Sequence, residues 1–450
     1  MTPRFHPVLL TALLCWLGLG QVQGQAESRG QGISSTVFHS LEEVLDYTDN
    51  QSLNLRNDAL RLDQAKKAKL AAVLGTVDIT GALLSAQFTN NTNLGVNLFP
   101  AEIFGGEPGT FREVEMGVQY NTNLTNYADV KLINPAGWSN LKLANINIDL
   151  SSTNQQVSRK NLQENIAANY YNIVSLQEQI ESSKQNLAAS DTLHQIVVHK
   201  YEEGLVKQQD VNDSKVNYLN TQESLHQLEY LLEQYYISLK LLCDIPEETA
   251  VNIQPGKVAP PSLLMPSIQL NGLELEQARL QEAYALQSYK GTKAAYLPSL
   301  SLQLSNSNNL YNTEFEPFTG NWINSNYIGV NLNIPIPSSQ RVSQTYAAKY
   351  DYQMAINQTE QARIKASLDQ KSLKNEYEKA QSQARTNREI LSLRQDTFYK
   401  NQELYREGLI SLEQTINSFN AMVNAQYALI SSEVSVDLAL SNINIHNNIR

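Results

Sequence analysis

The sequence predicts an internally duplicated α+β membrane protein in which each repeat combines a β-hairpin with very long coiled-coil helices. Two segments of 65 and 70 residues, 139–203 and 338–407, contain neither glycine nor proline, the residues that most often interrupt helices. Each of them follows a pair of segments with alternating apolar and polar residues, which is typical of β-strands. Because the same order occurs twice, the chain is predicted to be a duplication.

The composition excludes several classes of protein. The chain has 450 residues and a formal net charge of −11, which disfavours a general nucleic-acid binder because phosphate recognition needs clustered Lys and Arg. After residue 25 there is no stretch of the ~20 consecutive apolar residues that a membrane-spanning helix needs. Only two cysteines occur, Cys15 and Cys243, so a disulfide framework and a Cys-based zinc site are excluded.

The first 24 residues are predicted to be a signal peptide. Arg4 supplies a basic start, residues 8–19 form an apolar run, and residues 22–24 suit a cleavage site after Gly24. Lipidation of Cys15 is an alternative, but the apolar run continues past this cysteine. Removal of the signal peptide would take Cys15 away and leave Cys243 without a partner in the mature chain. We therefore expect Cys243 to be a buried structural thiol.

Four helices are predicted to be unusually long. Each glycine- and proline-free run ends at a Gly-Leu pair, Gly204-Leu205 or Gly408-Leu409, and a further such segment follows, 206–245 or 410–450. At ~1.5 Å per residue the 65-residue run would extend about 100 Å. The return segment of the first repeat has apolar residues at alternating spacings of three and four, as in a coiled-coil seam: Leu225, Leu228, Leu232, Tyr235, Leu239 and Leu242.

Each repeat is predicted to carry one β-hairpin with strands of membrane-spanning length. In the first repeat the alternating segments are 76–99 and 111–133, and in the second they lie around 300–304 and 328–334. Strands of roughly ten residues with a period of two are typical of outer-membrane barrels. Aromatic residues gather at the hairpin ends, and an interfacial girdle and ordinary strand packing explain them equally well: Phe99, Phe104, Phe111, Tyr311, Phe315, Phe318, Trp322 and Tyr327.

A shorter helix is predicted before each hairpin. The first begins with a capping box at Ser40 and Glu43 and extends to about Val73, and the second covers about 270–295. A proline-rich connector separates the repeats. The domain boundaries predicted from these observations are 25–245 for the first repeat, 246–268 for the connector and 269–450 for the second repeat.

Four membrane strands cannot exist alone. Every backbone N–H and C=O in hydrocarbon must be paired, so the sheet has to close on itself, and the smallest outer-membrane barrels have about eight strands. Several copies of the chain would therefore have to share one barrel. The long helices would then surround the same axis, which predicts an oligomeric tube.

The sequence resembles the TolC-like outer-membrane efflux proteins of Gram-negative bacteria over residues 40–442. The motifs that carry the resemblance are the two Tyr-x-x-Gly-Leu turns, which are related by an offset of 204 residues. Two others are the Ala-Tyr-Leu-Pro-Ser-Leu entry to the second hairpin at 295–300 and the Ile-Pro-Ile-Pro exit at 334–337. The ordered duplication makes the resemblance more specific than any one motif.

The resemblance implies a homotrimer in the outer membrane, with a twelve-stranded β-barrel above a twelve-helix tunnel in the periplasm. It implies a passive exit channel for efflux or type I secretion that contacts outer-membrane lipid, a periplasmic adaptor (membrane fusion) protein and an inner-membrane pump of the RND, ABC or MFS type. No nucleic acid, cofactor or metal, and no enzymatic activity, is expected. The cargo and the particular pump are not specified by the sequence.

The resemblance also places the functional residues in the two turns at the periplasmic tip. The residues expected to engage the adaptor are Tyr201, Gly204, Leu205, Tyr405, Gly408 and Leu409. The residues expected to gate the entrance are Gln209, Asp210, Tyr405, Gln414 and Asn417. Gln414 and Asn417 stand where family members frequently have acids, so a cation-dependent closure is in doubt, and a hydrogen bond from Tyr405 to Asp210 or Gln209 is the alternative tie.

The sequence departs from the family pattern before the first hairpin, where Leu74-Gly75 replaces Leu-Pro. Gly75 is expected to break the helix there. Three other functions compete with an exit channel. An exported structural or adhesive coiled-coil protein without a pore is the main alternative, although membrane-length hairpins argue against it. A periplasmic enzyme is disfavoured because the sequence contains no recognisable catalytic motif. A periplasmic adaptor is disfavoured because adaptors usually have one coiled-coil hairpin, whereas this sequence predicts two.

Overall fold

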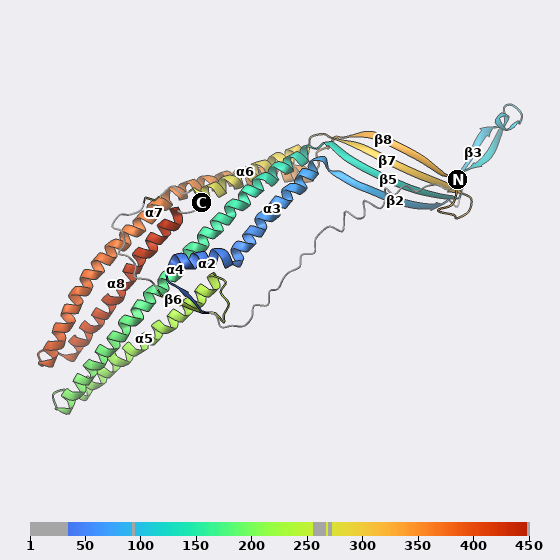
Figure 1. The fold of residues 1–450 in the computed structure, drawn as a ribbon. Coiled ribbons are helices and arrows are strands. Elements are labelled where there is room, and N and C mark those ends of the chain that lie inside the picture. Colours follow the sequence, from blue (N-terminus) through green and yellow to red (C-terminus); the bar gives the residue numbers. More distant parts are fainter. Residues whose placement is uncertain (1–34, 92–94, 255–266, 269–271, 448–450) are drawn as a thin grey trace.

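The computed structural model describes residues 35–91, 95–254, 267–268 and 272–447. The expected signal peptide, Cys15 and part of the proline-rich connector lie outside these residues. Long helices occupy one end of the molecule and the main sheet the other (Figure 1). The helices are α2 (Leu41–Gln51), α3 (Leu53–Val77), α4 (Pro135–Glu202), α5 (Gln208–Leu242), α6 (Leu273–Ala294), α7 (Ser339–Arg406) and α8 (Leu412–Asn447).

The predicted duplication is present, and the first repeat contains additional short elements. The strands are β1 (Ser35–Phe38), β2 (Ile79–Asn90), β3 (Gly95–Pro100), β4 (Phe111–Met116), β5 (Tyr120–Ile133), β6 (Ala250–Ile253), β7 (Ser299–Asn312) and β8 (Trp322–Asn333). Helices α4 and α7 have 68 residues each and correspond to the two predicted long helices. Each one pairs with the shorter helix that follows it, α5 or α8.

The main sheet contains the four membrane-length strands in the order β2-β5-β7-β8, all antiparallel. Strands β5 and β7 belong to different repeats, so their pairing joins the two halves of the molecule. Strands β2 and β8 are the edges of this sheet, and neither has a second neighbour within the described chain. The sheet is therefore open in a single copy.

The prediction of one continuous hairpin in the first repeat was wrong. The chain leaves the sheet after β2 and returns at β5, and between them β3 and β4 pair only with each other. This separate arm projects beyond the sheet (Figure 1). At its base Gly117 has φ 131°, a conformation that glycine adopts at little cost. The alternation of apolar residues continues across this break, and a sequence pattern alone therefore cannot locate it.

The prediction of a single helix from residue 40 to about 73 was also wrong. Ser40 caps α2 as expected, because its Oγ accepts the Glu43 N–H at 3.3 Å. The helix then breaks at Ser52, and the carboxylate of Asp244 accepts hydrogen bonds from Ser52 Oγ (3.2 Å) and the Leu53 N–H (2.8 Å). A side chain 191 residues away in the sequence therefore caps the start of α3.

Gly75 does not end the helix before the first hairpin. Helix α3 continues through Gly75 to Val77, and Asp78 ends it in the left-handed conformation with φ 41°. The Gly75 carbonyl accepts a hydrogen bond from Asn134 Nδ2 at 2.9 Å. Asn134 also caps α4 by accepting the Gly137 N–H. The helices that enter and leave the hairpin are therefore tied to each other at their bases.

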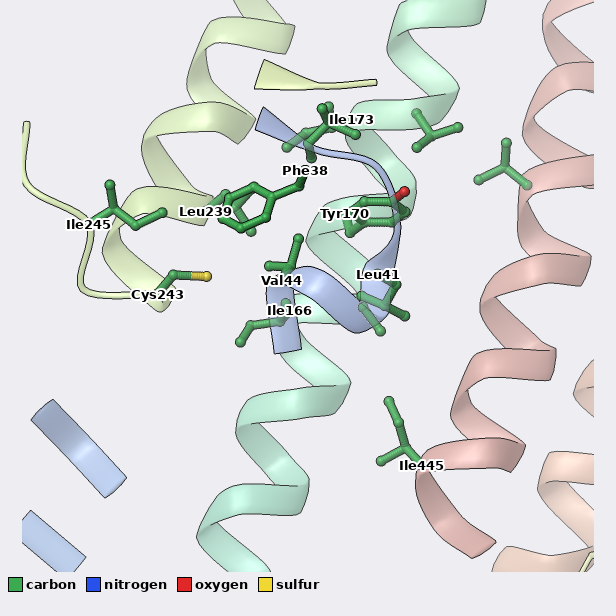
Figure 2. Close-up of a cluster of buried hydrophobic side chains, with 14 residues drawn as sticks. Phe38, Leu41, Val44, Ile166, Tyr170, Ile173, Leu239, Cys243, Ile245 and Ile445 are labelled. Atoms are coloured by element: carbon green, nitrogen blue, oxygen red, sulfur yellow. The ribbon is translucent and has the colours of Figure 1, made fainter. Parts of the chain in front are cut away.

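The main hydrophobic core lies near the middle of α4, where α2 and the end of α5 pack against it (Figure 2). The buried residues Val44, Ile166 and Leu239 come from these three helices and are each 0% exposed. Next to them the short parallel pair of β1 and β6 places Phe38 and Ile253 in the same core. Strand β6 lies in the predicted connector, so this segment is partly built into the fold.

The predicted coiled-coil seam of α5 is confirmed. Leu225 and Leu239 are buried, and the other four residues of the seam are half-buried.

Within the described residues, no helix is both long enough and apolar enough to cross a membrane.

Cys243 ends α5 inside the main core and is completely buried, as predicted for a structural thiol. Burial raises the pKa of this thiol to about 11. At pH 8 a thiol with that pKa has roughly 200-fold less thiolate than one with an ordinary pKa of ~8.5. Because the thiolate is the reactive form, Cys243 should be nearly inert.

We therefore expect maleimide to label Cys243 at least about 100-fold more slowly in the folded protein than after denaturation. The measurement uses a Cys15→Ser chain at pH 8. A chain with Cys15→Ser, Cys243→Ser and Ser224→Cys is the control, because residue 224 is exposed on the same helix. Equal labelling of the two folded chains would contradict the burial of Cys243.

Candidate functional site

The two predicted turns lie at the end of the molecule opposite the sheet (Figure 1). Gly204 joins α4 to α5 with φ 74°, and Gly408 joins α7 to α8 with φ 78°. A Cβ on either glycine would meet no atom within 4 Å. The requirement for glycine is therefore conformational, since a side chain in this left-handed region costs ~1–2 kcal/mol.

Both turns have the hydrogen-bond pattern of a Schellman motif. In the first, the Leu205 N–H donates to the Lys200 carbonyl (2.8 Å) and the Gly204 N–H to the Tyr201 carbonyl (2.9 Å). In the second, the N–H groups of Leu409 and Gly408 make the equivalent bonds at 2.8 and 3.0 Å. The motif closes the helix end and leaves Leu205 and Leu409 65% and 66% exposed. The repeated sequence motif thus produces two equivalent exposed leucines.

The two tyrosines of the repeated motif have different environments. Tyr201 is 43% exposed, whereas Tyr405 is 4% exposed. Tyr405 packs in a small core with Leu193 and Val197 of α4 and with Leu412 of α8. It therefore connects the two helical hairpins, while Tyr201 faces outward.

Lys200 strengthens this connection between the hairpins. Its Nζ donates to the Arg406 carbonyl at 2.9 Å and lies 5.3 Å from the centre of the Tyr405 ring, within the range of a cation–π contact. An ammonium group from the first hairpin therefore binds the end of α7 in the second.

The Tyr405 hydroxyl has an unusual environment. It is buried and has no hydrogen-bond partner among the described residues, which is normally unfavourable. Burial raises its pKa to about 12, and the negative charge of Asp210 contributes to this shift. The hydrogen bond considered between Tyr405 and Asp210 or Gln209 is not formed within one chain, so a tie to a neighbouring chain stays a prediction.

Asp210 and Gln414 have the same role in the two repeats. Asp210 Oδ2 accepts the Lys207 N–H at 2.9 Å at the start of α5. Gln414 Oε1 accepts the Ser411 N–H at 3.4 Å at the start of α8, and Ser411 Oγ accepts the Gln414 N–H in return. The substitution of Gln for an acid therefore preserves this local contact and removes one charge.

The remaining predicted gating residues do not form a cluster. Gln209 and Asn417 are exposed, and nothing within the described chain brings them together with Tyr405.

The two histidines near the end of α4, His194 and His199, do not form a joint site. His194 Nδ1 lies 2.8 Å from Ser214 Oγ, and His199 lies beside Glu202. Burial lowers the pKa of His194. Among the described residues, no group of His, Cys, Asp and Glu has an arrangement suited to a metal ion.

Sequence reasoning missed the polar layer behind the first turn. Ser190, Ser214 and Asn217 are at least nine-tenths buried between α4 and α5, and Asn217 Nδ2 donates to Ser190 Oγ at 3.0 Å. Because small polar residues at seam positions look like ordinary surface residues, only the pairing of the helices shows that they are buried.

Comparisons with known proteins agree with this architecture. Residues 264–444 match the family model of the outer membrane efflux protein. A search of curated protein sequences gives no match. The match covers the second repeat, which contains the Leu-Pro entry and the Ile-Pro exit that the first repeat lacks.

Several solved structures share the fold over most of the chain. The outer membrane protein VceC from Vibrio cholerae has a TM-score of 0.72 at 16% identity, covering 90% of this chain and 95% of VceC. CusC has a TM-score of 0.74 at 14% identity, covering 93% and 95%. The CmeC outer membrane channel from Campylobacter jejuni has a TM-score of 0.67 at 15% identity, covering 90% and 85%.

These likenesses confirm the resemblance predicted from the repeated turns. At such low identity, the solved structures establish the fold, and the family model supplies the sequence evidence. The second repeat carries the sequence pattern of the outer membrane efflux proteins, and the described chain as a whole has the fold of TolC-like outer-membrane channels.

Proposed function

We propose that this protein is the outer-membrane exit channel of a tripartite efflux or export system, with its helical part in the periplasm. The observation that carries the proposal is the combination of an open four-stranded sheet with helices of 68 residues in one chain. Three copies would supply twelve strands, and β8 of one copy would pair with β2 of the next. The helices would then continue the tube below the membrane.

The two faces of the sheet suit such a barrel. On β7, one face carries Ser301, Gln303 and Ser305, and the other carries Leu302 and Leu304. The apolar face continues onto β8, where Ile328, Val330 and Leu332 are 58–75% exposed. Because barrels of this kind have an apolar outer surface and a polar interior, the leucine face would contact lipid and the serine face would line the channel.

The two turns are the proposed docking site for a periplasmic adaptor. Leu205 and Leu409 present equivalent exposed apolar side chains beside rigid Schellman turns. Three copies would display six such leucines around the entrance. An inner-membrane pump would drive transport, and the channel itself would be passive. The proposal therefore includes no catalytic role.

The direct test is the conductance of the purified full chain in planar bilayers, with the oligomer mass measured on the same sample. A trimer with discrete openings is expected, since one chain cannot close its sheet. A monomer without conductance would contradict the proposal and would favour a pore-free coiled-coil protein.

We expect Tyr405→Ala to loosen the entrance and to increase the conductance of the trimer. This substitution removes a buried ring that connects the two helical hairpins. Tyr201→Ala is the matched control, because Tyr201 occupies the same position in the other repeat and is partly exposed.

Asp210→Ala is expected to act in the same direction as Tyr405→Ala, because it removes both the charge near Tyr405 and the acceptor for the Lys207 N–H. Asp210→Asn keeps an oxygen acceptor and separates the two effects. Conductance at the wild-type level in both alanine variants would refute the assignment of these residues to the entrance.

We expect Gly204→Val and Gly408→Val to weaken adaptor docking and to leave trimers intact. A β-branched residue at positive φ would distort the turn, whereas the strands that hold the trimer lie at the opposite end (Figure 1). Gly204→Asn and Gly408→Asn are the controls, because Asn tolerates the left-handed conformation. The measurement is the fraction of an adaptor from the same organism that co-purifies with the trimer. Undiminished co-purification with the valine variants would rule out a docking role for the turns.

A further inference from the structure

Four asparagine side chains form a closed ring of hydrogen bonds across β7 and β8. Asn308 Nδ2 donates to Asn306 Oδ1 (2.9 Å), and Asn306 Nδ2 donates across the strands to Asn326 Oδ1 (2.7 Å). Asn326 Nδ2 donates to Asn324 Oδ1 (2.8 Å), and Asn324 Nδ2 returns to Asn308 Oδ1 (2.8 Å). Each amide thus donates once and accepts once within this asparagine ring.

The asparagine ring lies on the apolar face of the sheet. Asn306 and Asn308 continue the face of Leu302 and Leu304 on β7, and their partners on β8 continue the face of Ile328 and Val330. The opposite face already carries the serines and glutamine that would line the channel. In the proposed barrel, the ring therefore points away from the channel and toward the membrane.

An aromatic layer lies beyond the asparagine ring. The 313–321 loop folds over the end of the sheet, where Asn312 Nδ2 donates to the carbonyls of Glu316 (2.7 Å) and Thr319 (3.0 Å). The loop places Phe315 against Tyr120 and Phe318 against Phe88, with ring centroids 5.6 and 6.0 Å apart. Phe315 and Phe318 remain 65% and 70% exposed. The outward face thus has three layers: aliphatic, asparagine and aromatic.

The dimensions of a barrel place the asparagine ring at the membrane boundary. We set the lower edge of the aliphatic layer at Ile334, which directly follows β8 and is 63% exposed. Asn326 and Asn324 precede Ile334 by eight and ten residues along the strand. At ~3.3 Å per residue and a strand tilt of ~40°, they lie about 20 and 25 Å above Ile334. The apolar band of outer-membrane barrels is ~25 Å tall, so the ring coincides with its outer edge.

We propose that the asparagine ring and the aromatic layer together bind the sugar part of glycolipid headgroups in the outer leaflet, an inference that rests on the proposed barrel. An amide has two donors and two acceptor positions, so each asparagine keeps capacity for a further partner. Neutral groups that both donate and accept match sugar hydroxyls. The neighbouring loop carries the exposed acids Glu314 and Glu316, which disfavour recognition through phosphate alone.

The first test uses the wild-type trimer and native mass spectrometry to count retained lipids. The probes are lipid A, a neutral glycosyl diacylglycerol and phosphatidylglycerol, each mixed into phosphatidylcholine. We expect both sugar-bearing lipids to be retained in preference to phosphatidylglycerol. Retention of phosphatidylglycerol to the same extent, or no preference for any headgroup, would overturn the proposal without the need for a variant.

The second test uses the cross-strand variant Asn306→Val with Asn326→Val, which removes half of the asparagine ring and keeps residues that favour strands. We expect the affinity for the glycosyl lipid to fall ~tenfold, as the loss of one or two hydrogen bonds predicts. Asn309→Val is the matched control, because Asn309 lies on β7 but on the opposite face, where it bonds Asn123.

Unchanged glycolipid retention in the double variant would show that the asparagine ring only fixes the strand register, which would overturn the proposal. Conductance and trimer mass are measured on the same samples. A conducting trimer without headgroup preference contradicts this inference alone, whereas the absence of a trimer contradicts the proposed channel itself.

Discussion

The unpaired backbone groups along β2 and β8 impose the constraint on which the rest of the structure depends. A four-stranded sheet with an apolar face has two open edges in a single chain, and hydrocarbon offers no partner for their N–H and C=O groups. In the proposed trimer, closure by further copies would satisfy both edges at once. The helices of each copy would then surround the same axis, which would explain why one chain combines membrane-length strands with helices of 68 residues.

The duplication supplies the architecture, and the differences between the repeats supply the specific features. Both turns have the same Schellman hydrogen bonds, but Tyr405 is buried between the two helical hairpins while Tyr201 is partly exposed. The contacts of Lys200 with Arg406 and Tyr405 make this connection directional, from the first hairpin to the second.

Long helices also need lateral support between the membrane and the tip. Here the support comes from contacts between residues that are distant in the sequence. Strand β1 pairs with β6 near the middle of the helices, and Asp244 caps α3 from the end of α5. These contacts lie around the main core that contains Phe38, Val44 and Leu239 (Figure 2).

The sequence by itself determined the duplication, the long helices, the coiled-coil seam and the two turns. These features follow from local signals: the absence of glycine and proline, a 3-4 spacing, and the repeated Tyr-x-x-Gly-Leu motif. It also identified Cys243 as a buried thiol by elimination of partners. The helix cap by Ser40 was equally readable, because Ser40 and Glu43 lie within one helical turn, although the Glu43 carboxylate accepts the His39 N–H instead of completing the capping box.

Only the tertiary structure decided where the elements break and which side chains meet. The break at Ser52 depends on Asp244, and the departure of β3 and β4 from the sheet depends on pairing that alternation alone does not reveal. The burial of Tyr405 rather than Tyr201 likewise depends on which hairpin lies behind the turn. The asparagine ring forms because antiparallel register places two Asn-x-Asn pairs opposite each other. In each case the deciding contact joins segments that lie far apart in the chain or that must first be paired in register, and local sequence patterns do not encode such contacts.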